Sequence, residues 1–405
     1  MHSKTLKVLF FTLMLDMIGI GMIIPIIPVL FTDPSNPEFL LHGYSVSAQY
    51  LFSGAITAIF GIMLFLAAPI LGELSDVYGR KRLLTLGIGI LAFSQFLFGF
   101  GIEIGSLVLL FVSRAVAGLA GANFSIAQAS IADISEPHER ARNFGLIGAA
   151  FGIGFILGPV LGGLIVTATH SASAPFWFSG MLGVINVLLV TFFLPETRRV
   201  NPKVRQRFHL FKGVSNIHAA FRDHDARPVY LANFLFISGF AFFTSFIGIL
   251  LVNRFGQSEA QIGTFFGFVG IWIVITQGFI LRVLSKRYTE RTILRVTLAV
   301  LACAIAFYPL VPNVSWLFAL VPFLSIPNGL SMANMTALVS KSVSAERQGA
   351  ALGINGSLGA LSQGCVPLLA GFGSGLFGLS APFFFGGILV AGAWSLIWLQ
   401  HRQDA

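Results

Sequence analysis

Long runs of hydrophobic residues, separated by short polar segments, extend along nearly the whole chain. A helix rises about 1.5 Å per residue, so a run of about 20 residues can cross the ~30 Å hydrocarbon core of a bilayer. The chain is therefore predicted to be an all-α membrane protein. The runs predict twelve transmembrane helices, at residues 6–30, 49–72, 83–102, 106–133, 142–167, 174–194, 228–252, 261–283, 291–309, 314–340, 349–372 and 380–399.

The longest polar segment divides the predicted helices into two sets of six. This segment, residues 195–227, is rich in arginine and lysine, as expected of a linker outside the membrane. The loop after the second helix, residues 74–81 (LSDVYGRK), is echoed after the eighth by residues 284–291 (LSKRYTER). Duplicated bundles with a binding site at their interface are a common transporter plan. We therefore expect two six-helix bundles, residues 1–194 and 228–405, joined by the linker.

The distribution of positive charge predicts how the chain is oriented. Apart from Arg114 and Arg254, every lysine and arginine falls on the side of the predicted membrane that includes both termini and the linker. The positive-inside rule places that side in the cytoplasm. The net charge of +9 therefore does not indicate nucleic-acid binding, and 10% charged against 56% hydrophobic residues excludes an ordinary soluble domain.

No pattern in the sequence is typical of an enzyme or of a metal site. A phosphate-binding GxxxxGK[ST] loop is absent, no Ser/His/Asp arrangement is recognisable, and the eight histidines lack ligand spacing. The two cysteines, Cys303 and Cys365, lie in apolar runs and are interpreted as small packing residues. We expect no catalytic residue, metal or cofactor.

A loop rich in glycine and charge follows the second predicted helix, with the sequence GELSDVYGRKR at residues 72–82. Gly72 permits close helix approach, and Gly79 permits a tight turn. Asp76 can face the positive N-terminus of a helix, while Arg80 can pair with a nearby acid. The alternative is a loop of ordinary solvated charges.

Small residues recur in the fifth predicted helix at a spacing that would leave one side of the helix without side chains. A neighbouring helix could approach closely along such a groove, and a proline within it would bend the helix. The alternative is general packing of small residues. The residues of this pattern are Gly145, Gly154, Gly158, Pro159, Gly162 and Gly163.

Two charged residues are predicted to lie deep in the membrane. Arg114 falls within the fourth helix, and of the sixteen acidic residues only Asp16 is placed far inside a spanning helix. A charge at the bilayer centre costs at least ~2.5–3.5 kcal/mol, so each should face a cavity or a partner. A carboxyl group there can bind and release a proton. The alternatives are a structural arginine and a permanently neutralised carboxylate.

These segments together resemble the major facilitator superfamily, and within it the twelve-helix drug:proton antiporters, in particular the tetracycline efflux proteins. The resemblance extends over nearly the whole chain. In the family, the acid at Asp76 meets the eleventh helix and the arginine at Arg80 meets an acid that matches Asp133. The resemblance therefore implies a gate at the cytoplasmic side, formed by Gly72, Asp76, Gly79, Arg80 and Asp133.

The same resemblance assigns roles to the other segments. It implies that the glycine pattern of the fifth helix is the antiporter motif, and that residues 114–121 are the motif in which a buried arginine serves proton transfer. Asp16 corresponds to a functional acid of tetracycline exporters. This chain departs from those exporters in the third and ninth helices, where residues 83–101 and 293–308 carry no acid. The proton route and the substrate can therefore differ.

The resemblance predicts a proton-coupled transporter that exports small hydrophobic or amphipathic drugs by alternating access. These drugs would be either tetracycline-like compounds or the varied substrates of a multidrug exporter. The alternative is a proton symporter or facilitator that imports a nutrient or metabolite on the same fold. We expect its partners to be a small-molecule substrate, protons and the lipid bilayer, and no nucleic acid. We expect a monomer in the bacterial inner membrane with both termini in the cytoplasm.

Polar residues within apolar runs are candidates for the substrate site, because contact with lipid would leave their hydrogen bonds unmade. Such residues stand among the 42 phenylalanines of the chain, and Phe240 represents the aromatic part of the expected pocket. The predicted substrate-binding residues are Asp16, Gln49, Arg114, Asn233, Phe240, Thr244, Gln277, Asn328, Asn334 and Asn355.

Overall fold

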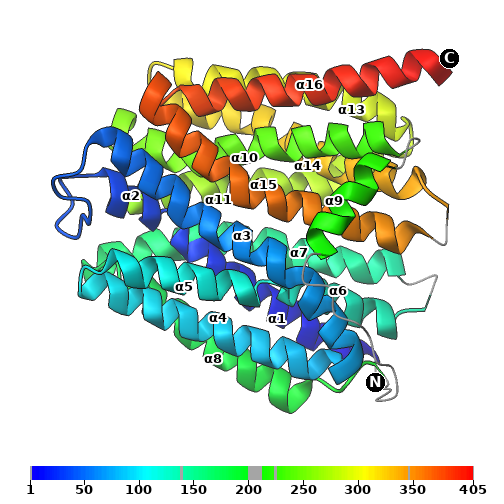
Figure 1. Cartoon of the computed structure of the whole chain (residues 1–405), viewed down its shortest axis with the longest axis horizontal. Helices are drawn as coiled ribbons and strands as arrows, with labels where there is room; N and C mark the ends of the chain where they lie inside the picture. The colour runs from blue at the N-terminus through cyan, green and yellow to red at the C-terminus, as the bar shows by residue number, and fades with distance from the viewer. Residues whose placement is uncertain (1, 137–139, 199–211, 223–225, 345–346, 405) are drawn as a thin grey trace. The chain divides into compact units, whose positions relative to one another are not determined.

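The chain folds into helices in a computed structural model that describes residues 2–136, 140–198, 212–222, 226–344 and 347–404. Twelve helical segments in the described part of the chain are long and apolar enough to span a membrane, and no strand occurs there. The helices are α1 (His2–Ile23), α2 (Ile26–Thr32), α3 (Val46–Tyr78), α4 (Arg80–Glu103), α5 (Leu107–Ala120), α6 (Asn123–Ile134), α7 (Arg140–Thr169), α8 (Ala174–Phe193), α9 (Lys212–Arg222), α10 (Arg227–Phe255), α11 (Glu259–Ile275), α12 (Leu281–Leu284), α13 (Glu290–Phe307), α14 (Val314–Lys341), α15 (Gln348–Phe377) and α16 (Ala381–Asp404) (Figure 1).

The twelve predicted membrane helices are confirmed, and three of them are interrupted. The first breaks between α1 and α2 at Pro25, whose missing N–H cannot continue the helix. The fourth, predicted as one helix over 106–133, instead ends at Ala120 and starts again at Asn123. The eighth contains a π-helical turn, η1 (Thr276–Ile280). Such turns interrupt the regular hydrogen-bond ladder and are frequent at functional sites.

The predicted linker contains a short helix as well as irregular chain. Helix α9 occupies Lys212–Arg222, and it buries Gly213 and Ala220 while Val214 and Phe221 remain exposed. The Asn216 side chain donates a hydrogen bond to Ser357 Oγ at 2.9 Å. The remainder of the basic stretch, residues 199–211 and 223–225, lies outside the described residues.

Two compact units make up the chain. Unit 1 consists of Met1–His42, Ile62–Lys212 and Gln257–Gly267, and unit 2 of Gly43–Gly61, Gly213–Gly256 and Phe268–Ala405. Two helices contribute to both units, because α3 changes unit after Gly61 and α11 after Gly267.

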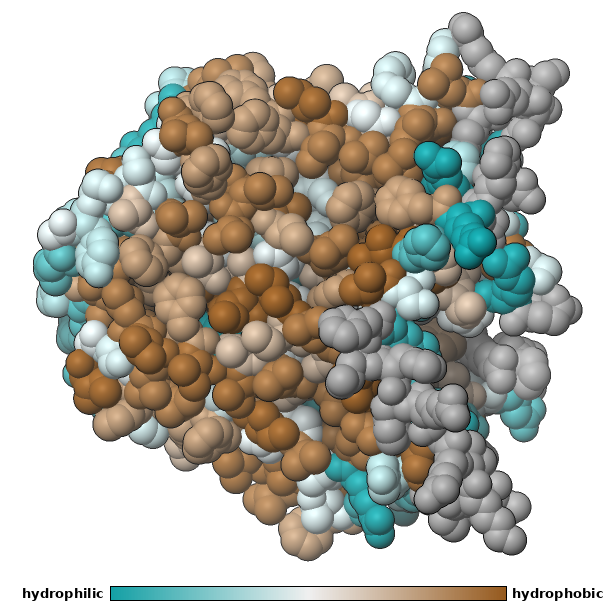
Figure 2. All heavy atoms as spheres, in the orientation of Figure 1, coloured by the Kyte–Doolittle hydropathy of each residue, from teal (hydrophilic) through white to brown (hydrophobic). Residues whose placement is uncertain are grey.

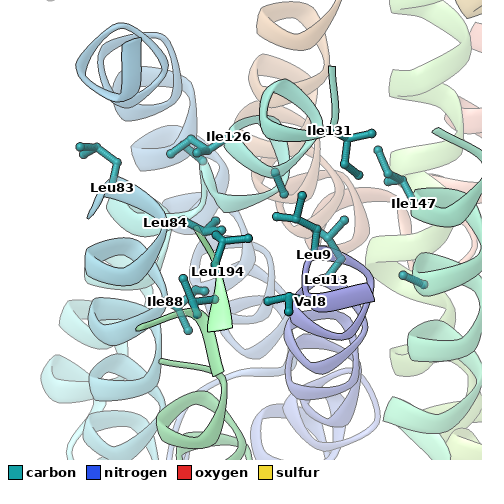
Figure 3. Close-up of a cluster of buried hydrophobic side chains, with 14 residues drawn as sticks. Val8, Leu9, Leu13, Leu83, Leu84, Ile88, Ile126, Ile131, Ile147 and Leu194 are labelled. Carbon is teal, nitrogen blue, oxygen red and sulfur yellow. The ribbon is translucent and has the colours of Figure 1, made fainter. Parts of the chain in front are cut away.

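A hydrophobic cluster holds the helices of unit 1 together. Leu9 and Leu13 of α1 lie among Leu84 of α4, Ile131 of α6 and Ile147 of α7 (Figure 3). These five side chains are at most 5% exposed. Aliphatic side chains from four helices thus fix the position of α1 in the middle of this unit.

The outer surfaces of the helices are hydrophobic, as lipid contact requires. Hydrophobic side chains gather over the middle of the helices and hydrophilic ones toward the helix ends (Figure 2). Cys303 and Cys365 are exposed, which corrects their interpretation as packing residues. Lipid is as apolar as a protein core, so an apolar run does not distinguish the two positions.

Candidate functional site

Asp16 of α1 is a buried carboxylate held by two neutral amides. Its side chain is 7% exposed. Asn186 Nδ2 of α8 donates a hydrogen bond to Oδ1 at 2.9 Å, and Asn123 Nδ2 of α6 donates one to Oδ2 at 3.3 Å. Within the described residues, Asp16 forms no salt bridge. Both oxygens of the carboxylate are therefore bonded, but its charge is not neutralised by a cation.

The interruption of the fourth membrane helix places one of these amides. Asn123 is the first residue of α6, directly after the break at Gly121 and Ala122. A Cβ atom built on Gly87 of α4 would overlap Asn123 Oδ1, so only glycine at that position lets the amide lie there. Asn123 is thus fixed between α4 and the Asp16 carboxylate.

A small cavity adjoins Asp16 inside unit 1. Its volume is about 10 Å³, which is room for about one water molecule. Gln95 of α4 and Ser179 of α8 supply polar groups to its wall, together with Asp16. Gln95 is 5% exposed. The carboxylate thus faces a polar space enclosed by α1, α4 and α8.

Arg114 is not among the hydrogen-bond partners of this carboxylate. It is in the middle of α5 and half-buried. The hydrogen-bond partners of Asp16 in the described part of the chain are the amides of Asn123 and Asn186, and Arg114 is not among them. The structure does not bring the two predicted proton-coupling residues into contact.

The loop between α3 and α4 forms an ion-pair network in unit 1. Arg80 is 5% exposed and pairs with Asp76 at 2.6 Å and with Asp133 of α6 at 3.1 Å. Arg198 also contacts Asp76, at 2.7 Å. Gly79 has a φ of 98°, a conformation that favours glycine at the turn.

Two features of this loop differ from the sequence-based expectation. Glu196, placed in the linker by its sequence, accepts hydrogen bonds from the backbone N–H groups of Arg80 and Lys81 at 2.8 and 3.2 Å. It therefore caps α4. A Cβ atom at Gly72 would meet no described atom within 4 Å, so no close helix approach occurs there.

Unit 2 contains a related ion pair with its charges exchanged. Glu290 is the first residue of α13, as Arg80 is of α4, and Lys341 is the last residue of α14. Lys341 Nζ lies 2.5 Å from Glu290 Oε1. In unit 1 the positive residue begins a helix and the negative residue lies at the end of one, whereas in unit 2 these positions carry the opposite charges.

The glycines of α7 pack against α1, with one exception. A Cβ atom at Gly158 would lie 2.7 Å from Gly21 Cα, and Cβ atoms at Gly154 and Gly162 would overlap Met17 and Met22. Gly163 faces a different helix, since its Cβ would lie 2.6 Å from Ala260 Cα of α11. The backbones therefore approach closely from Gly154 onward, with Pro159 inside the helix.

Gly145 does not take part in this contact, which corrects its assignment to the groove. It is exposed, and a Cβ atom there would meet nothing within 4 Å among the described residues. It lies more than two turns before Gly154, ahead of the stretch of α7 whose glycines meet α1. The repeating spacing in the sequence does not reveal where the contact starts.

The remaining predicted substrate-binding residues belong to unit 2, and few of them are brought together. Asn233 Nδ2 donates to Asn355 Oδ1. Three others donate hydrogen bonds to backbone oxygens close by in the sequence: Gln49 to Tyr44, Thr244 to Ala241 and Asn334 to Leu330. The ring of Phe240 stacks on that of Phe243. Asn328 is buried, and Gln277 lies in η1. The only direct link between members of this set in the described chain is Asn233 with Asn355.

Sequence reasoning missed the amides that contact Asp16. Asn123 and Asn186 are polar residues in apolar runs. The same criterion selected Asn233 and the other predicted substrate-binding asparagines in the second half of the chain. Applying the same criterion to the first half would have found them.

We predict that Arg80→Ala slows turnover several-fold and leaves substrate affinity unchanged. The substitution takes from Asp133 its cationic partner and leaves Asp76 with Arg198 alone, so the contact between α3, α4 and α6 at this end of unit 1 is weakened. Exchange rates in proteoliposomes and equilibrium substrate binding would measure the two effects. Arg82→Ala is the matched control, because Arg82 is exposed on the same turn. Equal losses in both variants, or a loss of substrate affinity, would contradict the prediction.

Comparison with known proteins identifies similar sequences over nearly the whole chain. A family model described as Major Facilitator Superfamily matches residues 9–362 and 229–404. The tetracycline resistance protein of class C from Escherichia coli is 29% identical, over 89% of this chain and 86% of that protein. The quinolone resistance protein NorA of Staphylococcus aureus strain MSSA476 is 26% identical, over 99% of this chain and 98% of that protein.

A solved structure has the same arrangement of helices. The crystal structure of the human organic anion transporter MFSD10 superposes with a TM-score of 0.74. The match covers 98% of this chain and 99% of that chain at 24% sequence identity. At this level of identity the likeness supports the fold alone.

Proposed function

The chain belongs to the Major Facilitator Superfamily, and we propose that it exports small hydrophobic or amphipathic drugs in exchange for protons. The family and the twelve spans make it a multi-pass membrane transporter. Its relatives include tetracycline and quinolone resistance proteins, and this similarity supports drug efflux as the class of transport.

The buried carboxylate of Asp16 carries the proposal of proton coupling. A charge taken out of water is costly unless it is paired. Asp16 has two amide donors and no cationic partner among the described residues. Binding a proton removes the charge, so this position is suited to take up and release one. Export would then follow when α1 exposes the site to each side in turn.

The close contact of α7 with α1 supports the same function. Asp16 lies on α1 beside Met17, and Met17 packs against Gly154 of α7. A movement of α7 therefore displaces the segment of α1 that carries the carboxylate. We further propose that the protein acts as a monomer in the bacterial inner membrane. Both of its termini would lie in the cytoplasm, because lysine and arginine are concentrated on that side of the spans.

Everted membrane vesicles that contain the protein test direction, coupling and substrate together. We expect tetracyclines, quinolones or lipophilic cations to accumulate in these vesicles when the interior is acidic, and to leave when the pH gradient collapses. Vesicles without the protein are the control. The alternative function, import of a nutrient, predicts that drugs are not accumulated and that right-side-out vesicles take up the nutrient with protons.

A further inference from the structure

The Asn186 side chain joins Asp16 to a second group on the same helix. One hydrogen of its amide goes to Asp16 Oδ1 at 2.9 Å and the other to the backbone oxygen of Thr12 at 3.0 Å. Both amide hydrogens are therefore used. Asn186 is fully buried, and this pair of bonds ties the middle of α8 to one turn of α1.

The other polar neighbours of Asp16 leave Asn186 as the movable partner. Asn123 is wedged against Gly87, where a Cβ atom would overlap its Oδ1. Three buried oxygens near the carboxylate accept no hydrogen bond within the described chain: Oδ1 of Asn186, Oδ1 of Asn123 and Oγ1 of Thr12. Each of the two amides that contact the carboxylate therefore has an unused acceptor, and of the two only Asn123 is held against Gly87.

Among the described residues, the charged groups of the helices around Asp16 lie at some distance along the helices from its amide partners. The helices that pack against α1 are α6, α7 and α8, and α4 borders the cavity. Helix α8 has no charged residue, and the charged residues of the other three helices lie at the helix ends. They are Arg80, Lys81, Arg82 and Glu103 of α4, Asp133 of α6, and Arg140 and Arg142 of α7. Arg114 of α5 is the remaining charge of this region, and it is not a partner of Asp16.

Proton uptake at Oδ1 of Asp16 changes the bond between Asp16 and Asn186. An ionised carboxylate only accepts hydrogen bonds, whereas a carboxylic acid also donates one. A protonated Oδ1 facing the Asn186 N–H would place two donors against each other. If the amide turns over, Oδ1 of Asn186 accepts the new O–H, but its bond to Thr12 O is lost.

We propose that Asn186 is the positioning residue through which the protonation state of Asp16 changes the contact between α1 and α8. The inference rests on the proposed function, because it takes Asp16 as the proton carrier. In the ionised state Asn186 binds both Asp16 and Thr12, and in the protonated state it releases Thr12. Protonation thus loosens one helix contact inside unit 1, where α1 also packs on α7.

The test compares Asn186→Leu with the wild type in drug-induced proton release from the purified protein. Leucine has nearly the same size but cannot donate to the carboxylate. A hydrogen bond to a charged group corresponds to about 1–2 pH units of proton affinity. We expect the pH of half-maximal proton release to rise by that amount, and turnover to fall while the KM for the drug stays unchanged.

Two further variants make the result specific. Asn143→Leu removes another buried amide of unit 1, which donates to Ser135 Oγ at 2.9 Å and does not touch Asp16. It should lower stability without moving the pH midpoint. Asn186→Ser keeps a short polar group and should fold even if leucine does not, with a smaller shift in the same direction.

Each outcome separates this inference from the proposed function. An unmoved midpoint in both Asn186 variants, with proton release still lost in Asp16→Asn, overturns the role of Asn186 alone. Normal proton release in Asp16→Asn overturns the coupling site itself. A shift of equal size in Asn143→Leu would mean that any loss of packing in unit 1 alters proton release, and would also overturn the inference.

Discussion

Export driven by a pH gradient should fall to the level of empty vesicles when Asp16 is replaced by asparagine. The substitution preserves size and most hydrogen bonding but removes the group that binds a proton. Its amide neighbours, Asn123 and Asn186, can still bond to a neutral side chain, so the protein should fold and insert normally. Drug uptake in everted vesicles and drug-induced proton release in detergent would measure the loss.

The control for this variant is Asp33→Asn. Asp33 is another carboxylate of unit 1, but it follows α2 at the end of a span and bonds to Ser35. Its replacement should leave coupling intact. Equal proton release in the wild type and Asp16→Asn would move the coupling site elsewhere, to Asp133 or to Glu139, which lies outside the described residues.

Transport should also be lost when Gly158 or Gly162 of α7 is replaced by leucine. A Cβ atom alone would lie 2.7 Å from Gly21 Cα at Gly158, and a leucine adds three further carbons. Because the obstacle is backbone, α1 and α7 must separate, and overpacking typically costs about 1–3 kcal/mol or more. Drug export and the thermal midpoint of the purified protein would report the two consequences.

Gly145→Leu is the matched control on the same helix. The built Cβ at Gly145 meets nothing within 4 Å in the described chain, so a larger side chain is accommodated without displacing α1. Export at the wild-type rate in the Gly158 and Gly162 variants would show that close packing of α7 on α1 is not needed. Equal losses in all three variants would mean that the glycines act by helix flexibility instead.

Much of the fold could be predicted from the sequence because each membrane helix has to be long and apolar. The interruption after α1 falls at Pro25 within a run that was predicted as one helix over residues 6–30. The interruption between α5 and α6 also fell within one predicted helix, since Gly121 and Ala122 are compatible with a continuous helix. Likewise, a run of apolar residues does not indicate which of its side chains are exposed, as Cys303 and Cys365 illustrate.

The candidate site was predictable as single residues and not as an arrangement. Asp16 stood out because a carboxylate in an apolar run is rare. Arg114 was assigned to proton coupling as well, but the sequence did not indicate which residues contact Asp16. The structure instead pairs Asp16 with Asn123 and Asn186, which carry no charge and lie far away in the sequence. Contacts between helices that are distant in the sequence depend on which face each helix turns toward its neighbours. The sequence alone does not specify that orientation.

The exchanged ion pairs of the two units differ in how the helix dipoles act on them. A helix has a partial positive charge at its N-terminus and a partial negative charge at its C-terminus, worth about 0.3–1 kcal/mol to a nearby charge. Glu290 at the start of α13 and Lys341 at the end of α14 are both placed favourably. Arg80 at the start of α4 and Asp133 at the end of α6 are both placed unfavourably.

The pair in unit 1 therefore works against the helices that carry it, and the one in unit 2 works with them. Glu196 at the start of α4 offsets part of this cost by accepting the first N–H groups of the helix. The helix dipoles therefore lower the free energy needed to open the contact in unit 1 and raise it for the contact in unit 2. The unit whose helices favour opening is the one that contains Asp16.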